Sequence, residues 1–191
     1  FDGKSLKPVR KFRTIMLNKP RGYECTTAAD TKNIYELLKN IRERLVPAGR
    51  LDKISEGLLI LSNDTRLIQK LTHPSFLCQK IYRVMVSGDL TPDIMQHLRD
   101  GVDIGDYVTR PAKVTFLRMG EKPGRKLLEF VLTEGKKRQI RLMCDAVGLE
   151  VHRLTRIQIN GLLLRDLKPG HWKDLTEKEL KINEFKTEEV L

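Results

Sequence analysis

The chain has 191 residues, of which 40% are hydrophobic and 32% are charged, a balance that excludes a disordered tail and a collagen-like fibre. Its formal net charge of +11 favours a polyanion as partner, although many folded proteins are simply basic. The three cysteines lie far apart with no histidine at ligand spacing, which argues against a disulfide framework or a zinc site and favours a reducing cytoplasm. No apolar stretch is long enough to span a bilayer.

The first segment, residues 1–13, is polar and basic, and a glycine and a proline interrupt any regular pattern. We expect it to be a linker or the end of an upstream domain, also because the chain begins with Phe rather than Met. The fold is expected to begin at Thr14 with a short apolar strand, which Pro20 and Gly22 end.

The next segments alternate between helix and strand patterns. Residues 33–45 have the spacing of a helix face, with apolar side chains at Ile34, Leu37, Leu38 and Ile41. The apolar run at 57–64 predicts a strand followed by a turn, and residues 65–74 predict a short helix that a proline ends. Alternating β-branched residues predict a strand at 80–88.

Residues 91–101 carry the clearest helix signals in the chain. Thr91 suits the N-cap, Pro92 suits the first helical position, and a glycine follows at the end. Apolar residues between turn formers then predict strands at 102–117 and at 127–132.

A further helix is expected over residues 134–148. The face that would pack on the core carries Ile140, Met143, Cys144 and Val147. A different side would present Arg138, Arg141 and Asp145, the last two four residues apart. Basic side chains outnumber acidic ones in and just after this segment, so it is the best candidate surface for RNA. The last residues, 177–191, are rich in Glu and are expected to form a charged tail or helix.

The most unusual local sequence starts at Pro47 and reads PAGRLDKISEGLLILSND. It resembles the signature of the RsuA, RluB, RluE and RluF family of bacterial pseudouridine synthases and is nearest to the RluF-like branch. Other segments match the family in order, namely LNKPRGY from Leu17, KIYRVMVSG from Lys80, EGKKRQIRLMCDAVG from Glu134 and GHWKDLT from Gly170. Because several motifs match in order between residues 14 and 176, chance is a poor explanation.

The fold expected from these observations is α+β, since strands and helices alternate irregularly. The resemblance implies the pseudouridine synthase catalytic fold over residues 14–176. This fold is a mixed, mainly antiparallel sheet flanked by helices, divided into two subdomains around a central basic cleft. The resemblance also implies that residues 1–13 are the end of an S4-like RNA-binding domain, which many family members carry upstream.

The resemblance assigns the chemistry to three residues. Asp52 of GRLD would be the nucleophile, Arg141 the cation that faces it, and Tyr82 the active-site tyrosine. Converting uridine to pseudouridine breaks the bond between the sugar and N1 and rejoins the base through C5, which requires no cofactor and no metal. A carboxylate kept ionised beside a cation in a water-poor pocket can suffice. Attack on the sugar C1′, attack on the base C6 and elimination all remain open.

A stacked uridine must leave the RNA helix to reach such a pocket. By resemblance, Arg50 would occupy the vacated space. Phosphate contacts would come from Lys19, Arg21, Lys80, Lys136, Lys137 and Arg138. The family points to ribosomal RNA, first of the large subunit, with small-subunit ribosomal RNA and tRNA as alternatives. No membrane and no obligate protein partner is expected.

Each of these residues also has a simpler interpretation when taken alone. Asp52 would be a turn aspartate, and Tyr82 would be an aromatic that packs on a sheet. Arg138 and Arg141 would lie on a solvated helix face, with an ion pair between Arg141 and Asp145. The rival function from another class is a noncatalytic RNA-binding or ribosome-assembly module, which the joint presence of Asp52, Tyr82 and Arg141 disfavours.

Overall fold

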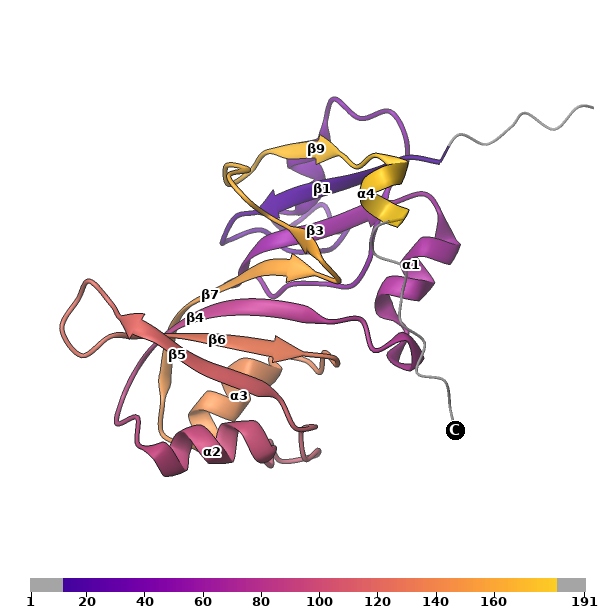
Figure 1. Cartoon of the computed structure of the whole chain (residues 1–191). Coiled ribbons are helices and arrows are strands. Elements are labelled where there is room, and N and C mark those ends of the chain that lie inside the picture. The colour runs from indigo at the N-terminus through magenta and orange to yellow at the C-terminus, as the bar shows by residue number, and fades with distance from the viewer. Residues whose placement is uncertain (1–11, 182–191) are drawn as a thin grey trace, which may run out of the picture.

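The computed structural model describes residues 12–181, and a single mixed sheet runs through this part of the chain (Figure 1). Its main strands have the order β5-β6-β4-β7-β3-β1-β9, while β2 pairs with β3 and β8 pairs with β7. All pairs are antiparallel except the short parallel pair of β3 and β7. The strands are β1 Thr14–Lys19, β2 Val46–Pro47, β3 Glu56–Ser62, β4 Lys80–Ser87, β5 Lys113–Met119, β6 Lys126–Leu132, β7 Glu150–Ile159, β8 Leu162–Leu163 and β9 Trp172–Asp174.

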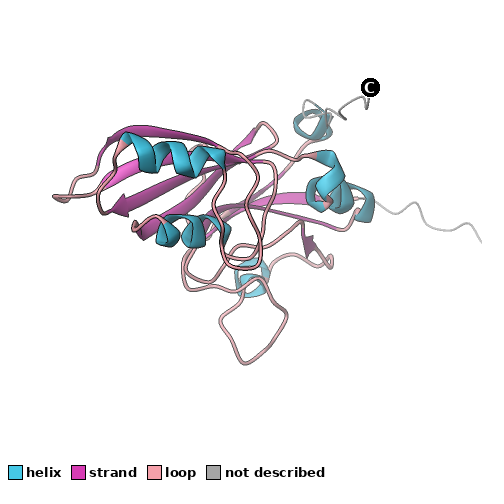
Figure 2. Cartoon of the chain, turned by 90° about the horizontal axis from the view of Figure 1, so that it is seen from below, coloured by secondary structure: helices cyan, strands magenta, loops and turns pink. Residues whose placement is uncertain are grey.

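Helices flank this sheet, so the expected α+β class with a mixed, mainly antiparallel sheet is confirmed. They are α1 Thr65–Thr72, α2 Pro92–Asp100, α3 Gln139–Ala146 and α4 Glu177–Lys181, with the 3₁₀ helices η1 Ile34–Leu38 and η2 Pro74–Phe76. Figure 2, seen from below, shows α2 and α3 in front of the strands that they cover. Within residues 12–181, no helix has both the length and the apolar character that crossing a membrane requires.

The sheet has two halves, joined where β3 meets β7 (Figure 1). We call strands β1, β2, β3 and β9 the β1 half, and strands β4 to β8 the β4 half. In the β1 half, successive residues of β3 pack on opposite sides: Leu58 packs with Leu71 of α1, and Leu59 packs with Ile34 and Leu38 of η1. Both faces are therefore buried, which explains the continuous apolar runs of β1 and β3.

Within the described part of the chain, α2 and α3 cover one face of the β4 half. Ile140, Met143 and Cys144 of α3 and Leu98 of α2 pack there against strand residues such as Leu128. The expected core-facing side of α3 is thus confirmed at Ile140, Met143 and Cys144. Beyond the start of α3 this face of the sheet is no longer covered by a helix, and the cavity described below opens at that point.

Three local predictions are wrong, the first of them the helix over 33–45. A capping box on Asn33 starts a helix as expected, yet the chain forms only the five-residue η1. It must end early because Leu45 turns into the core and β2 pairs with β3 directly afterwards.

The second is the strand over 102–117, which begins only at Lys113. Residues 102–112 form a loop with one isolated bridge. Within it, the side chain of Asp103 accepts a hydrogen bond from the backbone of Gly105, a local turn that competes with strand pairing.

The third concerns the start of α3. Arg138 lies outside the helix, in a left-handed conformation with φ of 56°. The helical-wheel pattern predicted that Arg138 and Arg141 share a helix face. Because Arg138 lies outside the helix, they do not. Gln139 begins the helix instead, and its side chain binds the backbone N–H of Lys136 and the carboxylate of Glu134.

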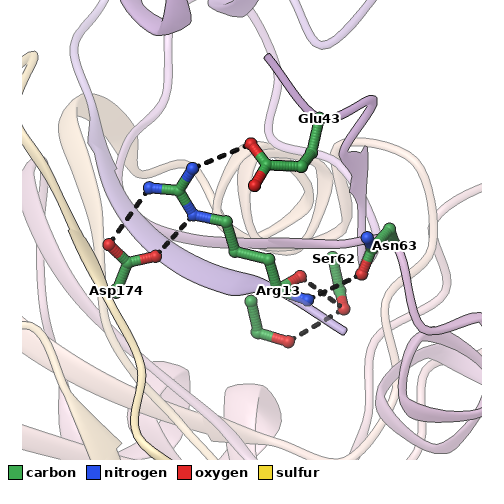
Figure 3. Close-up of polar contacts among 6 residues, drawn as sticks. Arg13, Glu43, Ser62, Asn63 and Asp174 are labelled. Atoms are coloured by element: carbon green, nitrogen blue, oxygen red, sulfur yellow. Dashed lines mark hydrogen bonds and ion pairs between the residues drawn. The ribbon is translucent and has the colours of Figure 1, made fainter. Parts of the chain in front are cut away.

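Arg13 joins the ends of three strands, although the domain was expected to begin at Thr14 (Figure 3). Its guanidinium donates to both carboxylate oxygens of Asp174, at 2.7 and 3.1 Å, and to Glu43 at 2.9 Å. Its backbone N–H donates to the side chain of Asn63 at 2.8 Å. The hydrogen bond from Arg13 lowers the pKa of Asp174.

Gly57 fixes how closely the two halves approach each other. It has φ of +105° and pairs with Arg156 across the parallel bridge, and an added Cβ would collide with the carbonyl oxygen of Arg156. We expect Gly57→Ala to lower the free energy of unfolding by about 3 kcal/mol, measured by urea denaturation. Gly124→Ala is the matched control, because it has φ of +72° with no atom near the added Cβ. If the free energy of unfolding fell equally in both variants, the close approach of Gly57 to Arg156 would add nothing beyond the effect of the positive φ.

Candidate active site

One cavity of about 960 Å³ opens where the two halves meet. Its walls come from the loop before β3, the beginning of β4, the middle of β7 and the segment around the start of α3. Eight of the residues singled out in the sequence line it, namely Arg50, Asp52, Lys80, Tyr82, Lys136, Lys137, Arg138 and Arg141. Basic side chains outnumber acidic ones along the lining, as anionic RNA would require.

Asp52 lies half-buried in the loop between β2 and β3. The loop is held in place on both sides of it, because Leu51 is buried in the core of the β4 half and the carbonyl of Asp52 accepts a hydrogen bond from the N–H of Ser55. Lys53 is held by an ion pair of 3.0 Å with Glu24. Within residues 12–181, the carboxylate of Asp52 itself has no ion pair within 4.0 Å and no hydrogen bond. The turn at this position therefore does not use the aspartate side chain.

Arg141 reaches from α3 toward the same loop. Its Nη2 donates to the carbonyl of Ile54 at 3.2 Å, and its Nη1 donates to Val151 at 3.4 Å. The simpler interpretation, an ion pair with Asp145, is not what these contacts show. Burial lowers the pKa of Arg141, and the positive charge of Arg138 adds to this, whereas the nearby Asp52 opposes it. The guanidinium thus lies within electrostatic range of Asp52 while it fixes the loop that carries it.

Tyr82 lies on β4 at the boundary between the core and the cavity. The residue is 8% exposed and packs in the same cluster as Leu51, so it also fulfils the simple role of a core aromatic. Asp52, Tyr82 and Arg141, from three separate parts of the chain, therefore line one cavity.

Lys19 was predicted to contact RNA, and this prediction is wrong. Its side chain is fully buried, and its Nζ donates to the carbonyls of Ser55 at 2.7 Å and Pro20 at 3.0 Å. Burial lowers the pKa of Lys19 to about 8. The lysine therefore fastens β1 to the end of the Asp52 loop and presents no charge to a phosphate.

This placement predicts how RNA binding responds to salt. Each lysine that neutralises a phosphate contributes about one unit to the slope of log K against log salt concentration. We expect Lys19→Met, at a buried position, to leave this slope unchanged. Lys137→Met, at an exposed position on the cavity lining, should reduce it by about one unit. Titrations at several salt concentrations measure both; a reduced slope for Lys19→Met would mean that the buried position is wrong.

The other predicted phosphate contacts differ in depth. Arg50, Lys136, Lys137 and Arg138 are exposed on the cavity lining. Lys80 lies deeper, its Nζ donates to the carbonyl of Cys78 at 2.8 Å, and burial lowers its pKa. Arg21 is exposed but does not line the cavity, and it donates to the carbonyl of His152 at 3.4 Å.

Sequence reasoning missed one wall of the cavity. Tyr107 donates to Glu134 at 2.7 Å, the backbone N–H of Arg110 donates to the same carboxylate at 3.0 Å, and Lys136 lies 4.2 Å from the ring centre of Tyr107. These contacts join the loop 102–112 to the segment before α3. Because that loop was read as a strand, no signal placed Tyr107 or Arg110 at the site.

Arg156 was missed as well. It lies on β7, is 3% exposed and lines the cavity. In the sequence it is one more basic residue in a β-branched run, and nothing there indicates burial. Within residues 12–181, no group of three or more His, Cys, Asp or Glu side chains is arranged to hold a metal ion.

Comparison with known proteins gives a consistent result. The model of the RNA pseudouridylate synthase family matches residues 13–146. An RNA pseudouridine synthase of Aquifex aeolicus is 38% identical over 94% of this chain and 72% of its own length. The ribosomal large subunit pseudouridine synthase B of Bacillus subtilis is 36% identical over 87% of this chain and 69% of its own. The dual-specificity RNA pseudouridine synthase RluF of Escherichia coli is 36% identical over 87% of this chain and 55% of its own length.

Solved structures agree on the fold. A crystal structure of a pseudouridylate synthase superposes with a TM-score of 0.78 at 27% identity, over 92% of this chain and 75% of that one. The archaeal box H/ACA sRNP Nop10-Cbf5 complex contains a chain that superposes with a TM-score of 0.53 at 20% identity, over 76% of this chain and 47% of that one. At this level of identity the likeness concerns the fold alone.

Proposed function

The chain belongs to the RNA pseudouridylate synthase family, of the RsuA, RluB and RluF type, and we propose that it isomerises a specific uridine of ribosomal RNA through Asp52. The observation that carries this proposal is the single cavity lined by Asp52, Tyr82 and Arg141. The residues 14–176 would form the catalytic domain, and Arg13 is tied to it by its ion pairs.

The geometry supports a division of roles among the three residues. Arg141 supplies a positive charge within electrostatic range of Asp52, on the same cavity. It also fixes the loop through Ile54, so that the carboxylate is positioned before the substrate arrives. The ring of Tyr82 offers a surface on which a uracil can stack, and its hydroxyl can assist removal of the C5 proton.

The cavity also fits a uridine that has left its helix. Its volume lies in the range of sites that enclose a small ligand, while its rim carries Lys136, Lys137 and Arg138 at positions exposed to solvent. Arg50, exposed beside Asp52, would fill the gap left by the flipped base. The proposed substrate is large-subunit ribosomal RNA, because one relative is a ribosomal large subunit pseudouridine synthase. A tRNA is the second candidate, because a stem-loop of similar local shape could enter the same cavity. Another relative is named a dual-specificity enzyme, which allows for more than one kind of target.

The test is to incubate the purified protein with unmodified transcripts of both ribosomal RNAs and of tRNAs, and then to map pseudouridine. The expected result is a new pseudouridine at a discrete position of the large-subunit RNA. Modification of tRNA alone would move the assignment to the second candidate. Tight binding without any pseudouridine would favour a noncatalytic RNA-binding module.

A further inference from the structure

Arg156 is a buried cation that the roles given above do not use. Its Nε donates to the carbonyl of Leu58 at 2.7 Å, whereas its Nη2 is buried and has no hydrogen-bond partner within residues 12–181. No carboxylate lies within 4.0 Å of its guanidinium in the same part of the chain. A buried guanidinium with an unsatisfied donor costs free energy, so an apolar side chain would serve stability better here.

The position of Arg156 relates it to the reaction. It lies opposite Tyr82 in the pairing of β4 with β7, and paired residues place their Cβ atoms about 5 Å apart on one face of a sheet. Both residues line the cavity together with Asp52. Lys80 lies on the same face of β4, two residues before Tyr82, and the charge of Arg156 contributes to its lowered pKa. The floor of the cavity is therefore positively charged beside the ring on which the uracil would stack.

We propose that the Nη2 of Arg156 donates to a carbonyl oxygen of the flipped uracil and stabilises the negative charge that the base acquires when its bond to the sugar breaks. This proposal rests on the function proposed above. It adds a catalytic residue that contacts the base and that comes from β7, not from the Asp52 loop. Arginine stays protonated throughout, so it acts by charge and hydrogen bonding alone.

The chemistry shows when this charge is needed. In the two routes that act at the sugar, attack on C1′ and elimination, the C1′–N1 bond breaks and its electron pair leaves with the uracil, which becomes an anion shared by N1, O2 and O4. In the same step Asp52 either forms a bond to C1′ or accepts a proton from C2′. After the base rotates, C5 bonds to C1′, and the Asp52 bond breaks or the C2′ proton returns. The C5 proton is then lost and N1 gains a proton, so the product is an isomer of the substrate.

The burial of Arg156 argues against a phosphate contact. Phosphates lie on the outside of RNA, and the exposed Lys136, Lys137 and Arg138 are suited to them. A residue that is 3% exposed at the floor of the cavity can meet only a group that enters it, and the base is that group.

The experiment uses two versions of the RNA segment in which wild-type protein forms pseudouridine, one with uridine and one with 5-fluorouridine at the target. Fluorine withdraws electrons from the ring, so the departing uracil anion is more stable and depends less on the cation. Loss of the starting nucleoside is followed under single-turnover conditions, together with RNA affinity. For Arg156→Gln we expect the single-turnover rate to fall by about 100-fold with uridine and by at most about tenfold with 5-fluorouridine. RNA affinity should be unchanged.

Two further variants keep the result interpretable. Arg156→Lys retains the charge and can still donate to Leu58, so we expect it to recover at least part of the rate even if Arg156→Gln folds poorly. Arg153→Gln, at an exposed position of β7 off the cavity, should stay within about twofold of wild type.

Three outcomes would overturn the inference. Equal losses of rate on both RNAs would indicate a structural role, and weaker binding at an unchanged rate would indicate a phosphate contact. An Arg156→Lys variant as slow with uridine as Arg156→Gln would remove the role of charge. If the wild-type protein modified no RNA, the proposed function itself would fail first, so the two failures are distinguishable.

Discussion

Asp52→Ala is expected to abolish pseudouridine formation, with kcat lower by at least about 10⁴-fold, because the variant loses the group that reacts with the nucleoside. RNA affinity should be equal or slightly higher, since a negative charge leaves a cavity that binds a polyanion. Single-turnover conversion and a separate binding titration measure the two effects. The loop should remain folded, because it is held by Leu51, Lys53 and the backbone of Asp52 and makes no use of the carboxylate.

Asp145→Asn provides the matched control for this experiment. Asp145 is exposed on α3, one turn beyond Arg141, and does not line the cavity. Its replacement should leave the rate within about twofold of wild type. If Asp52→Ala kept a substantial rate, or if both variants lost activity alike, the assignment of Asp52 would be wrong.

Arg141→Leu is expected to lower kcat by about 10²- to 10³-fold while RNA affinity changes by less than about threefold. The variant removes the positive charge near Asp52 and also the hydrogen bond to Ile54 that positions the loop. Because Arg141 is half-buried and both of its terminal nitrogens already donate to backbone carbonyls, it has little capacity left for phosphates. The measurement is kcat and Kd determined on the same RNA.

Arg138→Leu separates this role from simple RNA binding. Arg138 is exposed on the cavity lining just before α3, so its loss should weaken binding and reduce the salt slope by about one unit with little change in kcat. Should Arg141→Leu instead behave in the same way as Arg138→Leu, Arg141 would be a phosphate contact.

Much of the candidate site could be predicted from the sequence, because the resemblance assigns the chemistry to short motifs that lie on well-defined elements. The segment around Asp52 leads into an apolar strand, and Tyr82 falls within a β-branched run. The helix with Thr91 at its N-cap and Pro92 at its first position is found at residues 92–100. These features depend on local backbone preferences, which a sequence shows directly.

The errors at Lys19 and Arg156 depend on contacts with distant parts of the chain, whereas the turn at Asp103 and the start of α3 are local features that the pattern did not show. The sequence suggests that Lys19 is a surface cation. In the structure it is buried, and its Nζ donates to the carbonyls of Ser55 and Pro20. Arg138 fits a helical wheel, but the helix begins one residue later. Arg156 can be recognised as part of the site only when β4 and β7 are paired and the cavity is known.

The central claim is that a uridine leaves its RNA helix and meets Asp52 between Tyr82 and Arg141. The most direct measurement is a crystal structure of the Asp52→Ala variant bound to the RNA segment that the wild-type protein modifies. We expect the target uracil against the ring of Tyr82, with its sugar C1′ within about 3.5 Å of the place of the missing carboxylate. A target uridine still stacked in its helix, or RNA bound on a face away from this cavity, would contradict the account.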